Sequence, residues 1–198
     1  CIEVDGTPYS LECINPIRLD NGPGGQEEHL LNQLLMRNRQ VYTDSLTKVF
    51  NRRYCDDRLR RLSGEYALAM IDIDNLKQIN DCLGHPAGDT AIYHTAQAIR
   101  AILRSQDELV RYGGDEFLLL FHSLPQNILR RKLEDICRAV RALRVADLPE
   151  LCITVSIGGV YAAGQISELV EKADLALYRA KAQKDSAVLY EEDFHDSE

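Results

Sequence analysis

Between residues 44 and 190, short apolar runs alternate with longer amphipathic stretches. The apolar runs are typical of buried strands, and they cover residues 66–71, 109–112, 116–121, 152–161 and 187–190. The amphipathic stretches repeat apolar residues at helical spacing and predict helices at about 75–83, 87–104, 126–144 and 167–183. Asp44 is expected to cap a further helix that runs through Arg53 and Leu59. This alternation indicates an α+β fold with a ferredoxin-like core, in which helices flank a central, mostly antiparallel sheet.

The first 43 residues follow a different pattern. A hairpin is predicted at residues 1–19, with a turn at Asp5-Gly6 and a second strand from Tyr9 to Ile17. A glycine-rich breaker at 21–25 precedes an amphipathic helix over Gln26–Tyr42. We therefore interpret residues 1–25 as the remnant of an upstream sensory domain, with the PAS type as a candidate, followed by a linker. Residues 26–43 form a linker helix that either packs on its own domain or pairs with its copy in a dimer, and 44–198 form the main domain.

Composition narrows the class of protein. The net charge is −8 and no dense basic run occurs, which argues against a nucleic acid polymer as partner. None of the six cysteines forms a C-x-x-C pair, so a zinc site or disulfide framework is disfavoured and a reducing cytoplasm is expected. No apolar run reaches the roughly 20 residues of a membrane span. Because the chain starts at Cys1, we interpret it as a fragment, and a membrane anchor upstream in the full-length protein stays open.

The segment Arg111–Phe117 carries the first candidate chemistry. Gly113 and Gly114 lie between two strand-like runs and predict a tight hairpin, on the expectation that glycine supplies a positive φ there. Asp115 and Glu116 follow directly, and adjacent acids repel each other unless a cation neutralises them. Carboxylate oxygens on a rigid turn suit Mg²⁺, which prefers oxygen ligands and substrate phosphates.

A second pair of acids, Asp72 and Asp74, ends the strand predicted at 66–71. If the hairpin lies beside that strand, Asp72 converges with Asp115 and Glu116, and the three carboxylates suit two Mg²⁺ ions bridged by phosphates. Asp74 is as readily a structural acid at the strand end. The chain lacks a G-x-x-x-x-G-K-[ST] loop, so lysines are the candidates for holding phosphates.

Seven motifs follow one another in order along the chain. They are Asp44-Ser45-Leu46-Thr47, Asn51-Arg52-Arg53, Asp72-Ile73-Asp74-Asn75-Leu76-Lys77, Asn80-Asp81-Cys82-Leu83-Gly84-His85-Pro86-Ala87-Gly88-Asp89, the hairpin Arg111–Phe117, Ser156-Ile157-Gly158 and Ala173-Asp174-Leu175-Ala176-Leu177-Tyr178-Arg179-Ala180-Lys181. On these motifs the chain resembles the GGDEF domains, most of which are diguanylate cyclases, from about Asp44 to about Leu189. The resemblance implies the palm-like fold that nucleotide cyclases and polymerases share.

The resemblance also implies roles for residues of the metal site. Asp72 and Asp115 correspond to metal ligands, Glu116 to a further ligand, and the backbone carbonyl of Ile73 joins them. Asp115 is also expected to assist deprotonation of the attacking hydroxyl. The implied cofactor is Mg²⁺, two ions per GTP, with Mn²⁺ able to substitute.

The resemblance likewise implies which residues bind the substrate and the product. Lys77 and Lys181 match positions that contact phosphates, and Lys77 also begins a helix, where free backbone N–H groups attract anions. Asn80 and Asp89 match positions that read guanine, while His85 is interpreted as structural. Arg104 and Asp107 have the spacing of the family's product-inhibition motif. An arginine fork suits phosphate and guanine edges.

The chain departs from the family pattern at a few positions. Lys48 and Leu76 stand where the family usually has glycine and phenylalanine. In the tail, Lys184 replaces a glycine, Asp185 a basic residue and Ser186 an asparagine. The family's arginine at position 185 contacts phosphates, so Asp185 is expected to weaken GTP binding unless a backbone shift lets Lys184 substitute.

The predicted function is that of a diguanylate cyclase that condenses two GTP molecules into cyclic di-GMP and pyrophosphate. It is expected to act as a homodimer with product inhibition, in the cytoplasm, under an upstream sensor domain. The alternative is a catalytically silent regulatory module that binds GTP or cyclic di-GMP. A third interpretation, synthesis of an adenine-containing dinucleotide, is disfavoured by Asp89, because adenine lacks the donor pair that a carboxylate accepts.

Overall fold

The computed structural model describes residues 2–4, 7–9 and 40–191, and the chain divides into two compact units, Cys1–Val41 and Tyr42–Glu198. In the first unit, β1 (Ile2–Val4) pairs antiparallel with β2 (Thr7–Tyr9). The predicted hairpin is confirmed for these strands, although the second strand begins at Thr7 rather than Tyr9. The rest of that predicted strand lies outside the described residues. So does the predicted helix over 26–42, except for residues 40–42, which are helical.

The second unit is built on a six-stranded sheet with the strand order β3-β5-β6-β4-β7-β8. The four inner strands pair antiparallel with one another, while β3 runs parallel to β5 and β8 runs parallel to β7 at the two edges. The strands are β3 (Phe50–Asn51), β4 (Ser63–Ile73), β5 (Glu108–Arg111), β6 (Glu116–Phe121), β7 (Val155–Gln165) and β8 (Ser186–Leu189). The mostly antiparallel sheet of the predicted α+β fold is confirmed.

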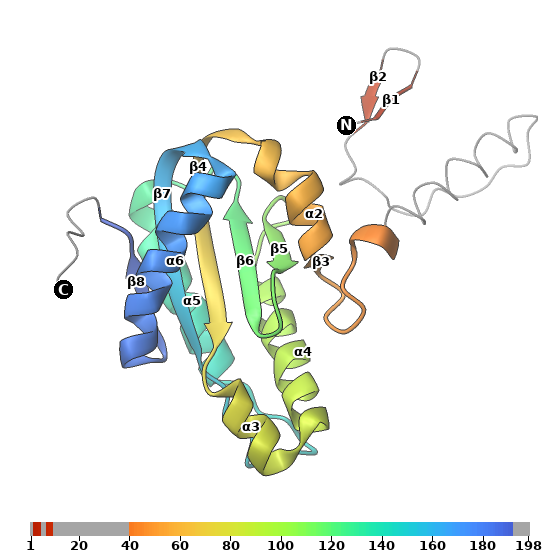
Figure 1. The fold of residues 1–198 in the computed structure, drawn as a ribbon, viewed down its shortest axis with the longest axis vertical. Helices are drawn as coiled ribbons and strands as arrows, with labels where there is room; N and C mark the ends of the chain where they lie inside the picture. The colour runs from red at the N-terminus through yellow and green to blue at the C-terminus, as the bar shows by residue number, and fades with distance from the viewer. Residues whose placement is uncertain (1, 5–6, 10–39, 192–198) are drawn as a thin grey trace, which may run out of the picture. The chain divides into compact units, whose positions relative to one another are not determined.

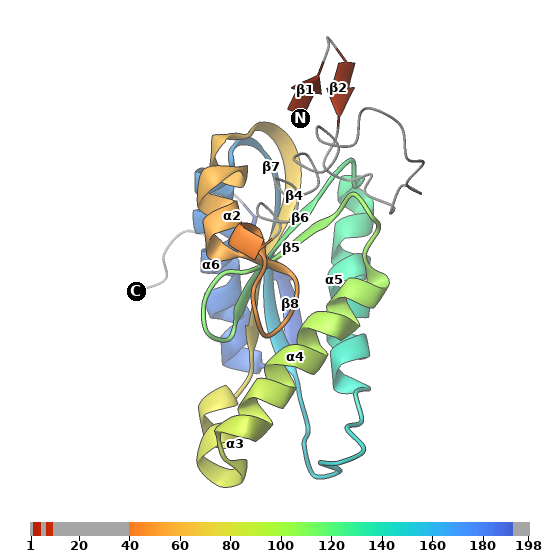
Figure 2. The same cartoon turned by 90° about the vertical axis from the view of Figure 1, so that its right-hand side faces the viewer.

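Helices cover both faces of this sheet (Figure 1). The long helices α4 (His85–Ile102) and α5 (Gln126–Arg141) lie on one face, and α2 (Arg52–Asp57) and α6 (Ile166–Gln183) lie on the other, as Figure 2 shows edge-on. The remaining helices are α3 (Leu76–Leu83), which directly follows the end of β4, and the 3₁₀ helix η1 (Leu59–Arg61). Among the described residues, no helix is long and apolar enough to cross a membrane.

The central strand β4 is buried on both sides, which explains why it reads as a continuous apolar run. Its side chains alternate between two hydrophobic cores. Ala69 and Ile71 pack in the core under α4 and α5, whereas Leu68 and Met70 pack in the core under α6. By the same alternation, Asp72 belongs to the α6 side of the sheet.

The predicted helix from Asp44 through Leu59 is wrong. Asp44 instead closes a turn, because its Oδ1 accepts from the backbone N–H of Thr47 at 2.8 Å and from the Thr47 hydroxyl at 2.7 Å. Lys48 then adopts a left-handed φ of 62°, which stops helix propagation. The short strand β3 follows, and α2 begins only at Arg52, capped by the Asn51 side chain.

Other elements match the predicted ones within a few residues. Strand β6 has the predicted bounds, whereas β4 is longer than predicted, β7 begins three residues later than predicted and α5 ends three residues earlier. The described cysteines are all free thiols: Cys55 and Cys137 are buried, and Cys82 and Cys152 are exposed.

Candidate active site

The end of β4 and the start of β6 bring two of the predicted acids together. Asp72 lies directly opposite Glu116 in the β4–β6 ladder, and the backbone N–H of Ile73 donates to the carbonyl of Asp115 at 3.2 Å. Opposed residues of antiparallel strands have Cβ atoms only about 5 Å apart. The candidate metal ligands Asp72, Ile73, Asp115 and Glu116 therefore gather at one end of the sheet.

In the turn between β5 and β6, the structure gives a reason for glycine at position 113 alone, and it differs from the one predicted. Neither Gly113 nor Gly114 has a positive φ, so that expectation is wrong. A Cβ at position 113 would lie 2.8 Å from Oε2 of Glu116, so a side chain there would displace the acid. A Cβ at position 114 would meet no described atom within 4 Å, which leaves this stretch of backbone open to a ligand.

Arg111 fixes the turn, and the sequence reasoning missed it. Its NH1 donates to both carboxylate oxygens of Asp44 at 3.2 Å, while its Nε and NH2 donate to the carbonyl of Gly114 at 3.3 and 2.9 Å. Burial alone would raise the pKa of Asp44, but hydrogen bonds from Thr47 and the Arg111 charge outweigh it and hold that pKa below its ordinary value. Arg111 thus ties the turn to the segment that begins the domain.

Lys181 of α6 reaches the acids from the helix layer. Its Nζ lies 2.7 Å from Oδ2 of Asp72, which is largely buried. Burial raises the pKa of Asp72, Lys181 opposes this, and the neighbouring charges of Asp115 and Glu116 add to the rise. Burial lowers the pKa of Lys181, but the three carboxylates outweigh it and raise that pKa overall. The site is therefore a group of acids with one ammonium as counter-charge.

The donor set suits a hard divalent cation. Within the described part of the chain, no three His, Cys, Asp or Glu side chains are arranged to hold a metal ion together. Asp72, Asp115 and Glu116 nevertheless supply only carboxylate oxygens, and burial, with a smaller contribution from the charges of Asp115 and Glu116, raises the pKa of Asp72. A cation bound there would replace Lys181 as the counter-charge of Asp72.

Asp74 has a structural role. Its carboxylate accepts from the hydroxyls of Thr154 and Ser156, both at 2.7 Å, and from the backbone N–H of Asp185 at 2.9 Å. Because Asp74 is buried and both its oxygens are engaged, it ties the end of β4 to β7 and to the loop after α6.

Of the two candidate phosphate residues, Lys77 lies at the start of α3, and Lys184 reaches the same place. Lys77 is exposed in the first turn of α3. Asn75, which precedes that helix with a φ of 57°, accepts from Nζ of Lys184 at 2.7 Å. Lys184 and Asp185 both adopt left-handed φ values, of 55° and 46°. This backbone geometry brings the Lys184 ammonium to the start of α3.

The Asp185 carboxylate points elsewhere. Its Oδ2 accepts from Nε of Arg141, on α5, at 2.6 Å. Because Arg141 neutralises it, the acid that replaces the family's basic residue is held in an ion pair rather than left as an isolated charge at the start of α3.

The two candidate guanine residues lie on the α3–α4 pair. The Asn80 amide packs against Gly88. A Cβ at position 88 would come within 2.8 Å of the Asn80 Cγ, so any larger residue there would displace the amide. Asp89 is exposed in the first turns of α4, and His85 is the first residue of that helix. Helix α3 follows the end of β4 and packs against α4, which places both candidate residues near the end of the sheet that carries the acids.

The candidate inhibition residues lie away from this site. Asp107 accepts from the backbone N–H of Arg104 at 3.0 Å and donates its own N–H to the Arg104 carbonyl at 3.1 Å, closing a turn. The turn precedes β5, at the opposite end of that strand from Gly113 and Gly114. The Arg104 side chain is exposed and open to a ligand from solvent.

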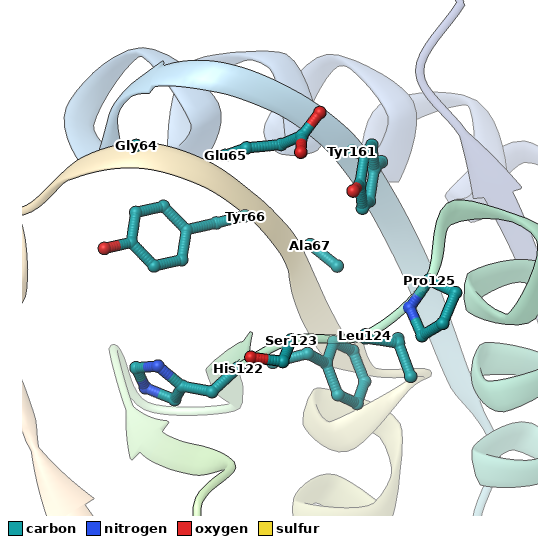
Figure 3. A pocket seen from close by; sticks show the side chains of 10 residues that line it. Gly64, Glu65, Tyr66, Ala67, His122, Ser123, Leu124, Pro125 and Tyr161 are labelled. Carbon is teal, nitrogen blue, oxygen red and sulfur yellow. The ribbon is translucent and has the colours of Figure 1, made fainter.

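A cavity of about 450 Å³ lies at the other end of the sheet (Figure 3). It is lined by the first residues of β4, by the segment that follows β6, and by Tyr161 of β7. None of the candidate site residues lines it, so this hollow and the acid cluster are separate features of the domain.

Comparison with known proteins gives consistent matches. A family model described as "Diguanylate cyclase, GGDEF domain" matches residues 41–187. The probable diguanylate cyclase DgcC of Escherichia coli is 34% identical over 148 residues, which cover 70% of this chain and 40% of that protein. The diguanylate cyclase TpbB of Pseudomonas aeruginosa is 36% identical over 156 residues, which cover 73% of this chain and 36% of that protein. The chain thus spans well under half the length of these relatives.

Solved structures agree in fold. The coiled coil and GGDEF domain of DgcB from Caulobacter crescentus, in complex with c-di-GMP, aligns with a TM-score of 0.76 at 29% identity, covering 83% of this chain and 94% of that chain. The diguanylate cyclase SiaD of Pseudomonas aeruginosa, in complex with its activator SiaC, aligns with a TM-score of 0.73 at 34% identity, covering 84% of this chain and 68% of that chain.

Proposed function

This chain belongs to the GGDEF domain family, and from that premise we propose that it is the catalytic domain of a diguanylate cyclase. The reaction would join two GTP molecules into cyclic di-GMP and release two pyrophosphates. The observation that carries the proposal is the group of acids at the end of β4, where Asp72 opposes Glu116 beside Asp115 and Lys181 supplies the counter-charge. The relatives named as diguanylate cyclases support the same activity.

The acids would hold Mg²⁺ through their carboxylate oxygens, with the Ile73 carbonyl as a further oxygen. Mg²⁺ or Mn²⁺ bound there would supply charge neutralisation at the α-phosphate and along the leaving pyrophosphate. Lys181 leaves Asp72 in this arrangement and turns to the phosphates. Lys77 and the backbone N–H groups at the start of α3 would also bind the phosphates, with Lys184 close by.

The bond changes follow from this placement. The 3′-oxygen of one GTP attacks the α-phosphorus of the other, and the bond from that phosphorus to the β-bridging oxygen breaks. Pyrophosphate leaves with the electron pair, and the carboxylate of Asp115 accepts the hydroxyl proton. The open backbone at Gly114 leaves room for a ribose to approach that acid. A second, identical step closes the ring.

Base selection falls to Asn80 and Asp89. A carboxylate accepts from N1–H and the exocyclic amine of guanine, and an amide offers both a donor and an acceptor. Adenine presents no such donor pair, so we expect GTP to be preferred over ATP. Gly88 supports this assignment, because a side chain at position 88 would overlap the Asn80 amide.

Each domain carries one such site, so condensation needs two sites that face each other in a homodimer, and an upstream sensor would act by setting that geometry. Arg104 and Asp107 would bind cyclic di-GMP as a separate inhibitory site. We expect the reaction in the cytoplasm, where GTP and Mg²⁺ are available.

Product identification tests the proposal. The purified chain is incubated with Mg²⁺ and either GTP or ATP, and the products are identified by mass spectrometry. Cyclic di-GMP from GTP alone, absent in Asp115→Asn, is the expected result. GTP or cyclic di-GMP binding without any product would instead favour a silent regulatory module.

A further inference from the structure

Helix α3 begins without a side-chain cap, although a residue suited to capping precedes it. Asn75 occupies the position from which an asparagine side chain ordinarily accepts from the first N–H groups of a helix. Its side chain makes no such bond, and its Oδ1 accepts instead from Nζ of Lys184 at 2.7 Å. The Asn75 side chain therefore leaves the first N–H groups of α3 open to another acceptor.

Lys184 is a cation whose described bond goes to a neutral group. The amide oxygen of Asn75 carries no charge, and Lys184 forms no ion pair with any described residue. Its side chain is exposed. An ammonium has three N–H donors, so the bond to Asn75 leaves donors of Lys184 for a ligand.

A second lysine reaches the same stretch of chain from the end of α6. Lys181 lies three residues before Lys184, and its Nζ is 2.7 Å from Oδ2 of Asp72. Lys184 reaches Asn75, three residues after Asp72. The two ammonium groups therefore follow the chain from the acids at the end of β4 to the start of α3. Positive charge beside open helix N–H groups suits a phosphate.

Two consecutive left-handed residues hold Lys184 in this place. Lys184 and Asp185 have φ values of 55° and 46°, which residues with a Cβ adopt only when the surrounding structure fixes them. The N–H of Lys184 donates to the carbonyl of Ala180 at 2.8 Å, and the N–H of Asp185 donates to Oδ2 of Asp74 at 2.9 Å. The buried Asp74 and the end of α6 thus fix the direction in which Lys184 leaves the backbone.

Arg141 holds the adjacent acid on the other side of this segment. It is the last residue of α5, and its Nε lies 2.6 Å from Oδ2 of Asp185. Without this pair, the Asp185 carboxylate would be an unpaired anion next to Lys184 in the chain and would compete for its ammonium. Arg141 therefore keeps the ammonium of Lys184 available to a ligand.

We propose that Lys184 binds the terminal phosphate of GTP, and that Arg141 is a positioning residue that keeps Asp185 away from it. This inference rests on the proposed function, which puts the α-phosphate at the acids. The phosphate chain then runs from the acids to the start of α3, and its far end meets Lys184 and the open N–H groups. Lys184 thus recognises a triphosphate and contributes little to binding a nucleotide with fewer phosphates.

Isothermal titration calorimetry with Mg²⁺ and three nucleotides tests the role of Lys184. The nucleotides are GMP, GDP and a GTP analogue with a methylene group in place of the α,β-bridging oxygen, which cannot release pyrophosphate. Lys184→Ala should bind the analogue about tenfold more weakly than the wild type, because a hydrogen bond to a charged group is lost. It should bind GDP and GMP like the wild type. Lys184→Arg should keep most of the affinity, since it keeps the charge.

A pair of substitutions tests the role of Arg141. Arg141→Gln should bind the analogue about threefold more weakly, because the exposed Asp185 charge is then unpaired. Adding Asp185→Asn to Arg141→Gln should restore the affinity, since it removes the competing charge. If Arg141 acted only by supporting the fold, the second substitution would not restore binding.

Lys48→Ala is the matched control. Lys48 is also an exposed lysine with a left-handed φ, of 62°, and its ammonium also donates to a neutral oxygen at 2.7 Å. It lies in the turn after Asp44 and outside the candidate active site. Lys48→Ala should bind all three nucleotides like the wild type. Circular dichroism should be the same for every variant, because each substituted side chain is at least partly exposed.

The outcomes separate this inference from the proposed function. A Lys184→Ala protein that binds the analogue like the wild type would overturn the inference and leave the proposed function standing. So would an equal loss for all three nucleotides, because the terminal phosphate would then not be the partner of Lys184. Failure of Asp185→Asn to restore binding would overturn the role of Arg141. A wild-type chain that binds none of the three nucleotides would overturn the proposed function, and this inference with it.

Discussion

Lys48 shows a residue held in a conformation that its side chain disfavours. Its φ of 62° lies in the left-handed region, which costs a residue with a Cβ roughly 1 kcal/mol relative to glycine. Among the described residues its ammonium donates only to the Ser45 carbonyl, at 2.7 Å and exposed to solvent, so little is lost on removing it. Lys48 in place of the family's glycine therefore strains the backbone locally and does not contribute to the candidate active site.

We expect Lys48→Gly to raise the free energy of unfolding by about 0.5–1 kcal/mol, measured by urea denaturation. Lys184→Gly is the matched comparison, because it relieves a similar φ but also removes the bond to Asn75. Destabilisation by Lys48→Gly would show that the Lys48 side chain matters more than its backbone conformation.

Asp44 predicts how stability depends on pH. Its folded-state pKa lies below the ordinary value of 3.8, so the stability that it contributes is fully present above that pH. It is lost as the pH falls through the folded-state pKa, because the protonated acid no longer pairs with Arg111. Urea denaturation at stepped pH should therefore show wild type more stable than Asp44→Asn at neutral pH, with the gap closing below pH 3.8. A gap that stays constant would contradict this role.

At the scale of elements, the β5–β6 turn is held by contacts from outside itself. Arg111 bonds both to Asp44 and to the Gly114 carbonyl, so it sets where Asp115 and Glu116 lie. Arg111→Ala should lower kcat by about 10²-fold, because displacing reacting groups by about 1 Å has that effect. Steady-state kinetics would measure this, with Arg53→Ala as control, since Arg53 forms an exposed ion pair with Asp57. Unchanged kcat in Arg111→Ala would exclude the positioning role.

Asp74 joins three elements and should matter for stability. Asp74→Ala leaves the buried Ser156 hydroxyl and the Asp185 N–H without their acceptor, and we expect a loss of about 3 kcal/mol in urea denaturation. Asp72→Asn, beside the same strand end, should keep most of the stability and lose GTP turnover. A stable Asp74→Ala protein would show that the β7 contacts do not depend on it.

The elements show where sequence patterns succeed. Strand β6 could be predicted to the residue, because an unbroken apolar run over 117–121 follows the two acids after the glycine turn. The prediction of a helix from Asp44 was wrong for two reasons. The Thr47 N–H and hydroxyl bond to the Asp44 carboxylate and form a turn, and Lys48 adopts a left-handed conformation although it is not glycine. The helix propensities of the individual residues predict neither the turn at Asp44 nor the left-handed conformation of Lys48.

At the scale of the whole molecule, the order of the strands decides which distant residues meet. The acids at the end of β4 and on the turn could be predicted to converge, since both lie at strand ends on a single sheet. The pairing of Arg111 with Asp44 could not, because it joins residues 67 positions apart through the parallel contact of β3 with β5. The Asp185–Arg141 pair likewise depends on how α5 packs beside β8.

The central claim is that two GTP molecules, each bound at one such acid cluster, react across a pair of domains. The most direct measurement is the initial rate of formation of cyclic di-GMP and of pyrophosphate from GTP and Mg²⁺ over a wide range of protein concentration. We predict two pyrophosphates per cyclic di-GMP and a rate per domain that rises with protein concentration until the pairs are saturated. Cyclic di-GMP formed at a constant rate per domain at every concentration, or GTP bound with no pyrophosphate released, would contradict the account.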